Sequence, residues 1–261
     1  MLLDSTLSLS PGQLLDLTGT QWFVVLTVIF LGGVAMGVGG FGFALVTTPA
    51  LLWVMPIPIV MITNLTLSVL LRLPLIYHDR HHFNRPIAKS IIIGGIAGLP
   101  VGILLLHLLS PSDIKLYASA TIMLLGLPYL VRAQRIPQWH RHVRASAGGV
   151  GLVSGMLTTS TSLAGPPVVL WLMNQRVVGR EYRGTVSWVA LTLNSSGVAV
   201  LVGAGTTAMG SLLLPLVLLP IAALGAFLGD RILKHLPIWL FTRIIASLII
   251  VSGFVGVWNA L

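Results

Sequence analysis

Long apolar stretches separated by short polar loops dominate this sequence. Their approximate positions are 22–53, 57–77, 87–109, 116–131, 145–173, 185–202, 212–228 and 239–258. About 20 apolar residues in helical form cross the hydrocarbon core of a bilayer. The pattern therefore predicts an all-α polytopic membrane protein built from about eight hydrophobic segments.

Composition strengthens this prediction and limits the partners. Hydrophobic residues make up 56% of the chain and charged residues only 8%, whereas soluble domains carry about 25% charged residues. The net charge is +9, and bases in short loops set the orientation of spans and meet lipid headgroups. We therefore expect membrane lipid, and not nucleic acid, as the partner of these bases.

The longest polar segment, 132–144, divides the chain into two repeats, 1–131 and 145–261. Each repeat opens with a long apolar segment that is interrupted near its middle, at 37–43 in the first and at 158–170 in the second. Each then has an apolar segment that contains an asparagine, Asn64 or Asn194. Similar elements in the same order indicate an ancestral duplication, and internal repeats are common in transporters. We expect 132–144 to be a cytoplasmic linker.

Basic residues favour the cytoplasmic side, and they indicate how the interrupted segments run. If segment 145–173 crossed the membrane once, five bases would lie outside: Arg176, Arg180, Arg183, Arg231 and Lys234. If it turned back at its break, all five would lie inside. A re-entrant hairpin plus three transmembrane helices is an odd number of crossings, so the two repeats would be inverted. Straight but broken helices are the alternative.

The two breaks form the candidate substrate site. Broken helices in matching places of two repeats indicate a transporter site, because the N-termini of half-helices attract anions. Hydroxyl groups beside the second break add hydrogen-bond donors. The alternatives are close packing by small residues and hydroxyl groups that bond their own helix. The candidate residues at the breaks are Gly37, Gly39, Gly40, Gly42, Thr158, Thr159, Ser160 and Gly165.

Three polar residues inside apolar segments extend this site. Asn64 and Asn194 contact substrate or link neighbouring helices. Arg72 is the one base well within a predicted span, where charge is costly and usually functional. It neutralises an anion or extends to the headgroups. No carboxylate falls in the middle of a predicted span, so an anion fits better than a cation as cargo.

Other chemistry finds little support in the sequence. The chain has no cysteine, which excludes thiolate metal sites and disulfides. His78 and His82 have the spacing of a metal pair, with His81 beside them, but we interpret this short basic stretch as an interfacial loop. The sequence shows neither a nucleophile paired with a base nor a metal-binding helix motif, which are the patterns that would suggest an enzyme. We expect no catalytic residues, no metal and no cofactor.

These motifs resemble the sulfite exporter TauE/SafE family, also called the toluene-sulfonate uptake permease family. The resemblance covers nearly the whole chain. It rests on Gly37-Val-Gly-Gly-Phe-Gly with Pro49-Ala-Leu, on Gly165-Pro166-Pro167 and on the glycine-rich segment 94–102. It departs from the family pattern where Phe41 interrupts the first glycine run and where Ala164 replaces a glycine.

The resemblance implies duplicated four-segment halves and export or uptake of sulfite, sulfonates such as sulfoacetate, or related small organic anions. Together with the breaks, it predicts a multi-pass secondary transporter of the bacterial inner membrane, an exporter of such anions. Rocking of the repeats would give alternating access to a small anionic substrate bound between the breaks. A membrane scaffold or assembly factor without transport and an anion channel are the alternatives, and a homodimer is left open.

Overall fold

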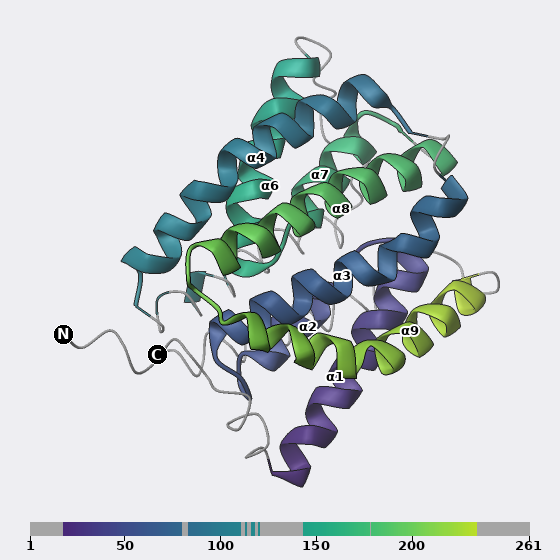
Figure 1. Ribbon diagram of the computed structural model, residues 1–261. Coiled ribbons are helices and arrows are strands. Elements are labelled where there is room, and N and C mark those ends of the chain that lie inside the picture. Colours follow the sequence, from purple (N-terminus) through teal and green to yellow (C-terminus); the bar gives the residue numbers. More distant parts are fainter. Residues whose placement is uncertain are drawn as a thin grey trace.

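The computed structural model describes residues 18–79, 83–110, 143–177 and 179–233, with 113, 116, 117 and 120 as isolated positions. Every regular element within these residues is helical, which confirms the predicted all-α class for this part of the chain. The elements, shown in Figure 1, are α1 (Gly19–Gly39), α2 (Phe43–Leu51), α3 (Ile57–Asp79), α4 (Arg85–Leu108), α6 (Val143–Thr161), α7 (Gly165–Asn174), α8 (Gly179–Gly203), the short 3-10 helix η3 (Met209–Leu212) and α9 (Leu213–Leu233).

Several of these helices are long and apolar enough to cross a membrane. They are Gly19–Val38, Ile57–Pro74, Arg85–Leu108, Gly179–Gly203 and Met209–Arg231. The chain is therefore a membrane protein of several spans. The predicted segments 116–131 and 239–258, and the linker up to residue 142, lie outside the described ranges, so the layout of eight segments and the division into repeats stay predictions. The last two residues assigned to the linker already belong to α6.

Both long apolar segments break where the sequence predicts. The first break separates α1 from α2, and Gly40 and Gly42 adopt positive φ angles of 70° and 103° there. Such angles are strained for residues with a side chain, so glycine suits this turn. The second break separates α6 from α7. Ser162 has a φ of 60°, and Pro166 stands in the first turn of α7, where proline is tolerated because no helical N–H bond is needed.

The first break reverses the chain. A methyl group added at Gly32 of α1 would collide with the side chain of Thr47 of α2. A straight helix would hold positions 15 residues apart at about 22 Å, so the straight alternative is wrong for this break. α6 and α7 also contact each other. The α1 arm, at 21 residues, is as long as a full span, which is longer than the half-helix that the hairpin model expects.

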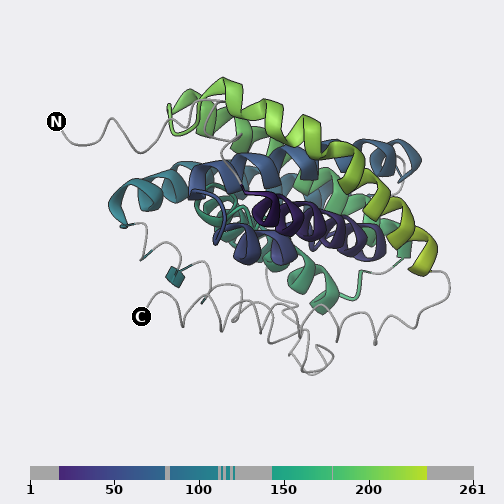
Figure 2. The same ribbon diagram turned by 90° about the horizontal axis from the view of Figure 1, so that it is seen from below.

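Glycines bring two pairs of helices into backbone contact. On α1, methyl groups added at Gly33 and Gly37 would collide with the carbonyl groups of Ala222 and Ala226 on α9. Residue numbers rise together along both helices, so α1 and α9 run parallel, side by side in Figures 1 and 2. Small residues at such crossings let helix backbones approach closely in a membrane.

The same arrangement joins α4 to α6. Added methyl groups at Gly94 and Gly98 of α4 would meet the backbone of α6, and one at Gly155 of α6 would meet the carbonyl of Gly95 on α4. These helices are again parallel. Each contact therefore joins one helix of the first predicted repeat to one helix of the second.

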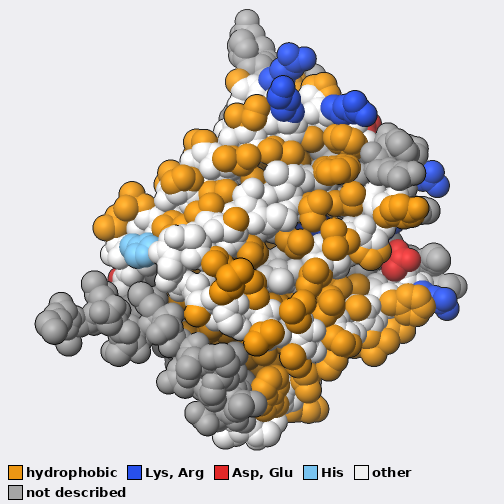
Figure 3. Space-filling view, in the orientation of Figure 1, with side chains coloured by type: hydrophobic (Ala, Val, Ile, Leu, Met, Phe, Trp, Pro, Cys, Tyr) orange, Lys and Arg blue, Asp and Glu red, His pale blue; other side chains and the backbone are white. Residues whose placement is uncertain are grey.

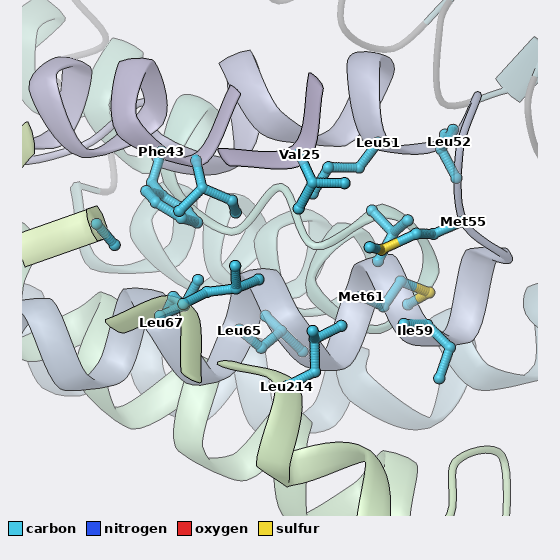
Figure 4. Packing of buried hydrophobic residues seen from close by; sticks show 14 of the residues in the cluster. Val25, Phe43, Leu51, Leu52, Met55, Ile59, Met61, Leu65, Leu67 and Leu214 are labelled. Atoms are coloured by element: carbon cyan, nitrogen blue, oxygen red, sulfur yellow. The ribbon is translucent and has the colours of Figure 1, made fainter. Parts of the chain in front are cut away.

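Two large apolar clusters form most of the interior. The first cluster contains side chains of α1, α2, α3 and α9, with Leu201 added from the end of α8; Figure 4 shows Val25, Phe43, Leu65 and Leu214 converging in it. The second cluster contains side chains of α4, α6, α7 and α8. In Figure 1 these two sets of helices meet along α3 of the first set and α8 of the second.

The exposed Lys and Arg side chains of the described residues lie at one end of the molecule. Arg85 and Lys89 begin α4, Arg180 and Arg183 begin α8, and Arg231 lies near the end of α9. Figure 3 shows the Lys and Arg side chains along one edge, here called the basic end, while hydrophobic side chains cover most of the visible face. This distribution matches the predicted cytoplasmic side of a membrane protein.

Candidate anion-binding site at the two breaks

The structure brings the two breaks together, as the sequence predicts. Residues 40–42 are called tip 1 and residues 162–164 tip 2. A methyl group added at Gly165 would lie 3.7 Å from Cβ of Phe41. A small apolar cluster of Leu45, Leu157 and Leu163, against which Phe41 packs, also lies at this junction. The two tips therefore face each other in the interior.

Asn64 is the centre of a buried hydrogen-bond network that joins tip 2 to α2 and α3. Its side-chain nitrogen donates to Thr48 Oγ1 at 2.9 Å and to Ser162 Oγ at 3.3 Å, while its oxygen accepts from Thr47 Oγ1 at 2.8 Å. Thr48 Oγ1 and Ser162 Oγ are 3.1 Å apart. In this arrangement Asn64 links helices, the alternative that the sequence left open.

The hydroxyl groups before tip 2 also have partners. Thr158 donates to the carbonyl of Ser154 at 2.7 Å, and Ser160 donates to that of Met156 at 2.8 Å. Thr159 instead donates to the carbonyl of Leu99 on α4 at 2.7 Å. The first two contacts are bonds within the helix, as the sequence alternative expected.

The candidate glycines occupy unequal positions. Gly37 packs against α9, and Gly39 is the last residue of α1. Gly40 and Gly42 form the turn itself. Gly165 begins α7, and no side chain caps the N-terminus of α2 or α7. The prolines that follow Gly165 have no N–H, so the first turn of α2 offers an anion more backbone donors than the first turn of α7.

Arg72 is buried, with 4% of its surface exposed, so the interpretation that it extends to the headgroups is wrong. Its Nη1 donates to the carbonyl of Gly40 in tip 1 at 2.7 Å, and its Nε has no partner. No carboxylate of the described residues pairs with it. The guanidinium therefore places an uncompensated positive charge beside tip 1.

Asn194 lies on α8, one turn before the point where α3, α6 and α8 meet. At that point an added methyl group on Gly197 would touch Thr158 of α6 and Leu65 of α3. Asn194 is 4% exposed and its Oδ1 has no partner. Ser154, one turn before Thr158 on α6, also has an unpartnered hydroxyl group. These groups leave hydrogen-bonding capacity free at the junction.

Sequence reasoning missed the roles of Thr47 and Thr48, whereas Ser162 belongs to the hydroxyl groups noted beside the second break. Thr47 and Thr48 also follow a break and carry hydroxyl groups, which is the signal that could have selected them. Ser162 is also one of the two non-glycine residues with positive φ in the described structure. For metals, the described residues contain no group of three potential ligands; His81 and His82 lie outside them.

Comparison with known proteins identifies the family of this chain. The model of the family described as Sulfite exporter TauE/SafE matches residues 25–255. The chain belongs to this family. No solved structure matches the chain.

One curated relative from Comamonas testosteroni carries the description "Probable inner membrane transporter protein TsaS". It is 37% identical over 122 residues, which cover 46% of this chain and 48% of that protein. The match thus spans about half the length of the relative.

Proposed function

We propose that this TauE/SafE protein is a secondary transporter that exports small anions such as sulfite, sulfoacetate or other organosulfonates across the bacterial inner membrane. The anion binds where the two tips face each other, and alternating access moves it across. The inner-membrane location follows the description of the TsaS relative and the candidate spans.

The observation that supports an anion most strongly is Arg72. A buried charge without a partner costs several kcal/mol, and within the described residues the guanidinium donates to the neutral Gly40 carbonyl and not to a carboxylate. An anion at tip 1 would supply the missing negative charge. An arginine fork suits an oxyanion such as a sulfite or sulfonate group, because it can donate two parallel hydrogen bonds.

Two further features support the placement. The unpartnered Oδ1 of Asn194 and hydroxyl of Ser154 are buried polar groups, and such groups normally have partners. The described carboxylates whose side chains are placed, Asp113, Glu181 and Asp230, lie at or beyond helix ends. A site without a buried carboxylate favours an anionic cargo.

The helix order supports two inverted repeats. α1, α2, α3 and α4 repeat the long, short, long, long order of α6, α7, α8 and α9. If the two repeats are interchanged, α1 corresponds to α6 and α9 corresponds to α4, so the α1–α9 pair corresponds to the α6–α4 pair. In both pairs the helices run parallel and meet at glycines. α1 and α4 run in opposite directions in Figure 1, so α6, parallel to α4, is inverted relative to α1.

Transport by purified protein in proteoliposomes tests the proposal. Flux of labelled sulfite or sulfoacetate should saturate and should rise when the opposite side contains unlabelled anion, which a channel or a scaffold would not show. Arg72→Gln should abolish this flux. Lys89→Gln, which removes an exposed charge at the basic end, should leave it unchanged. Equal flux in the Arg72→Gln and wild-type proteins would contradict the site.

A further inference from the structure

We propose that the bodies that move during transport are two mixed bundles rather than the two sequence repeats. The first bundle contains α1, α2, α3 and α9, and the second contains α4, α6, α7 and α8. Each bundle holds one break and takes one helix from the other repeat. The inference rests on the proposed transport and names the moving parts behind it.

Each bundle has its own interior. The first cluster draws on all four helices of the first bundle, and the second cluster draws on all four helices of the second. The contacts between glycines and the backbone of a neighbouring helix lie within bundles, since α1 with α9 and α4 with α6 are bundle partners. Backbone contacts of this kind have no side chain that could adjust, so separating or sliding these helices would open voids.

The seam between the bundles is different. It follows α3 and α8, which contact each other, and near the tips it contains hydrogen bonds from Asn64 and Thr48 to Ser162. A hydrogen bond contributes about 1 kcal/mol net, and water or a polar substrate can replace its partner. The small cluster at Phe41 is the apolar part of this junction.

The two ends of the seam are closed by unlike contacts. Away from the basic end, Leu201 of α8 belongs to the first cluster, and Ile103 and Leu106 of α4 pack against it. At the basic end, Arg183 of α8 and Asp230 of α9 form an ion pair at 3.7 Å with half-exposed side chains. Exposed pairs contribute only about 0–1 kcal/mol, so this ion pair adds little resistance to opening at the basic end.

Two cysteine pairs distinguish bundles from repeats. Arg183 and Asp230 belong to one repeat but lie across the seam. Ser90 and Gly148 belong to different repeats but to one bundle, and an added methyl group at Gly148 would lie 3.9 Å from the carbonyl of Ser90. Both pairs lie towards the basic end, and the chain has no cysteine of its own, so no background thiol interferes.

The experiment links each pair with a short bifunctional methanethiosulfonate reagent in proteoliposomes and measures sulfite flux before linking, after linking and after reduction. We expect linked Arg183→Cys/Asp230→Cys protein to lose at least tenfold in flux and to recover on reduction. Linked Ser90→Cys/Gly148→Cys protein should keep its flux. The opposite pattern would show that the repeats move, and equal effects of the two links would overturn the bundle assignment.

A measurement without transport separates this inference from the proposed function. Spin labels attached to the same two cysteine pairs report the distance between the labels by electron paramagnetic resonance. The Arg183 and Asp230 labels should give a broad or two-peaked distribution and the Ser90 and Gly148 labels a single narrow one. If the cysteine variants show no sulfite flux even after the links are reduced, the proposed function is contradicted. If the two pairs give matching distance distributions, the bundle assignment is contradicted.

Discussion

The two tips occupy matching places in the predicted repeats but are built from different chemistry. Tip 1 turns on Gly40 and Gly42, and its carbonyl group accepts a hydrogen bond from the buried cation Arg72. Tip 2 turns on Ser162, whose hydroxyl group joins a neutral network around Asn64. Similar breaks in the two segments thus hold a charged environment at one tip and a network that links helices at the other.

This difference teaches that the position of a break and its chemistry are separate properties. At each break the chain turns at a residue with a positive φ angle, whereas the surrounding helices supply the binding groups. The first turn of α2 keeps N–H donors that the prolines after Gly165 remove from α7. We therefore expect tip 1 to recognise the anion and tip 2 to hold the closed arrangement.

The most direct test of this difference is to substitute a residue at each tip and to measure the affinity for the anion. Arg72→Gln should weaken sulfite binding about a hundredfold, since removing a charge from a desolvated pair costs roughly 2–5 kcal/mol. Ser162→Ala at tip 2 should weaken it less than tenfold. The concentration dependence of thermal stabilisation by sulfite gives both affinities. A larger loss at tip 2 would reverse the roles of the tips.

The network at tip 2 should affect folding stability more than the turn at tip 1 does. Asn64→Ala removes the buried hydrogen bonds of Asn64 to Thr47, Thr48 and Ser162, and each such bond contributes about 1 kcal/mol. We expect the free energy of unfolding to fall by about 3 kcal/mol. Titration with a denaturing detergent measures this change. Thr192→Ala is the control, because Thr192 bonds only the Trp188 carbonyl of its own helix.

Backbone strain at tip 1 should have a smaller effect. Gly42 has a φ of 103°, so Gly42→Ala should destabilise the protein by about 1–2 kcal/mol. Gly149→Ala is the matched control, because no atom lies within 4 Å of its added methyl group and alanine favours a helix by about 1 kcal/mol. The same detergent titration should show shifts of opposite sign; two losses would argue against strain at the turn.

The smallest expected difference lies along the hydroxyl groups before tip 2. Thr159→Val removes a bond to the Leu99 carbonyl on α4 and should cost about 1 kcal/mol. Thr161→Val removes only a bond to the Leu157 carbonyl within α6, so its effect on the free energy of unfolding should be near zero. Equal losses would mean that the bond between helices adds nothing.

The sequence predicted the helical class, both breaks and the facing of the tips, because glycine, proline and hydroxyl residues interrupt otherwise uniform apolar segments. It could not predict the burial of Arg72 or the partners of Asn64. Both faces of a membrane helix are apolar, so the sequence has little periodicity that would show which face packs inward. Gly37 illustrates the same limit, since it was selected for the site and packs against Ala226 of α9.

By itself, the sequence determined that this protein resides in a membrane, that its long apolar segments break twice and that its bases favour one side. Composition and local turn chemistry are enough for these properties. Only the tertiary structure decided which helices share an interior, and it paired α1 with α9 and α4 with α6. A glycine permits two helices to approach closely, but only the packed fold determines which partner approaches.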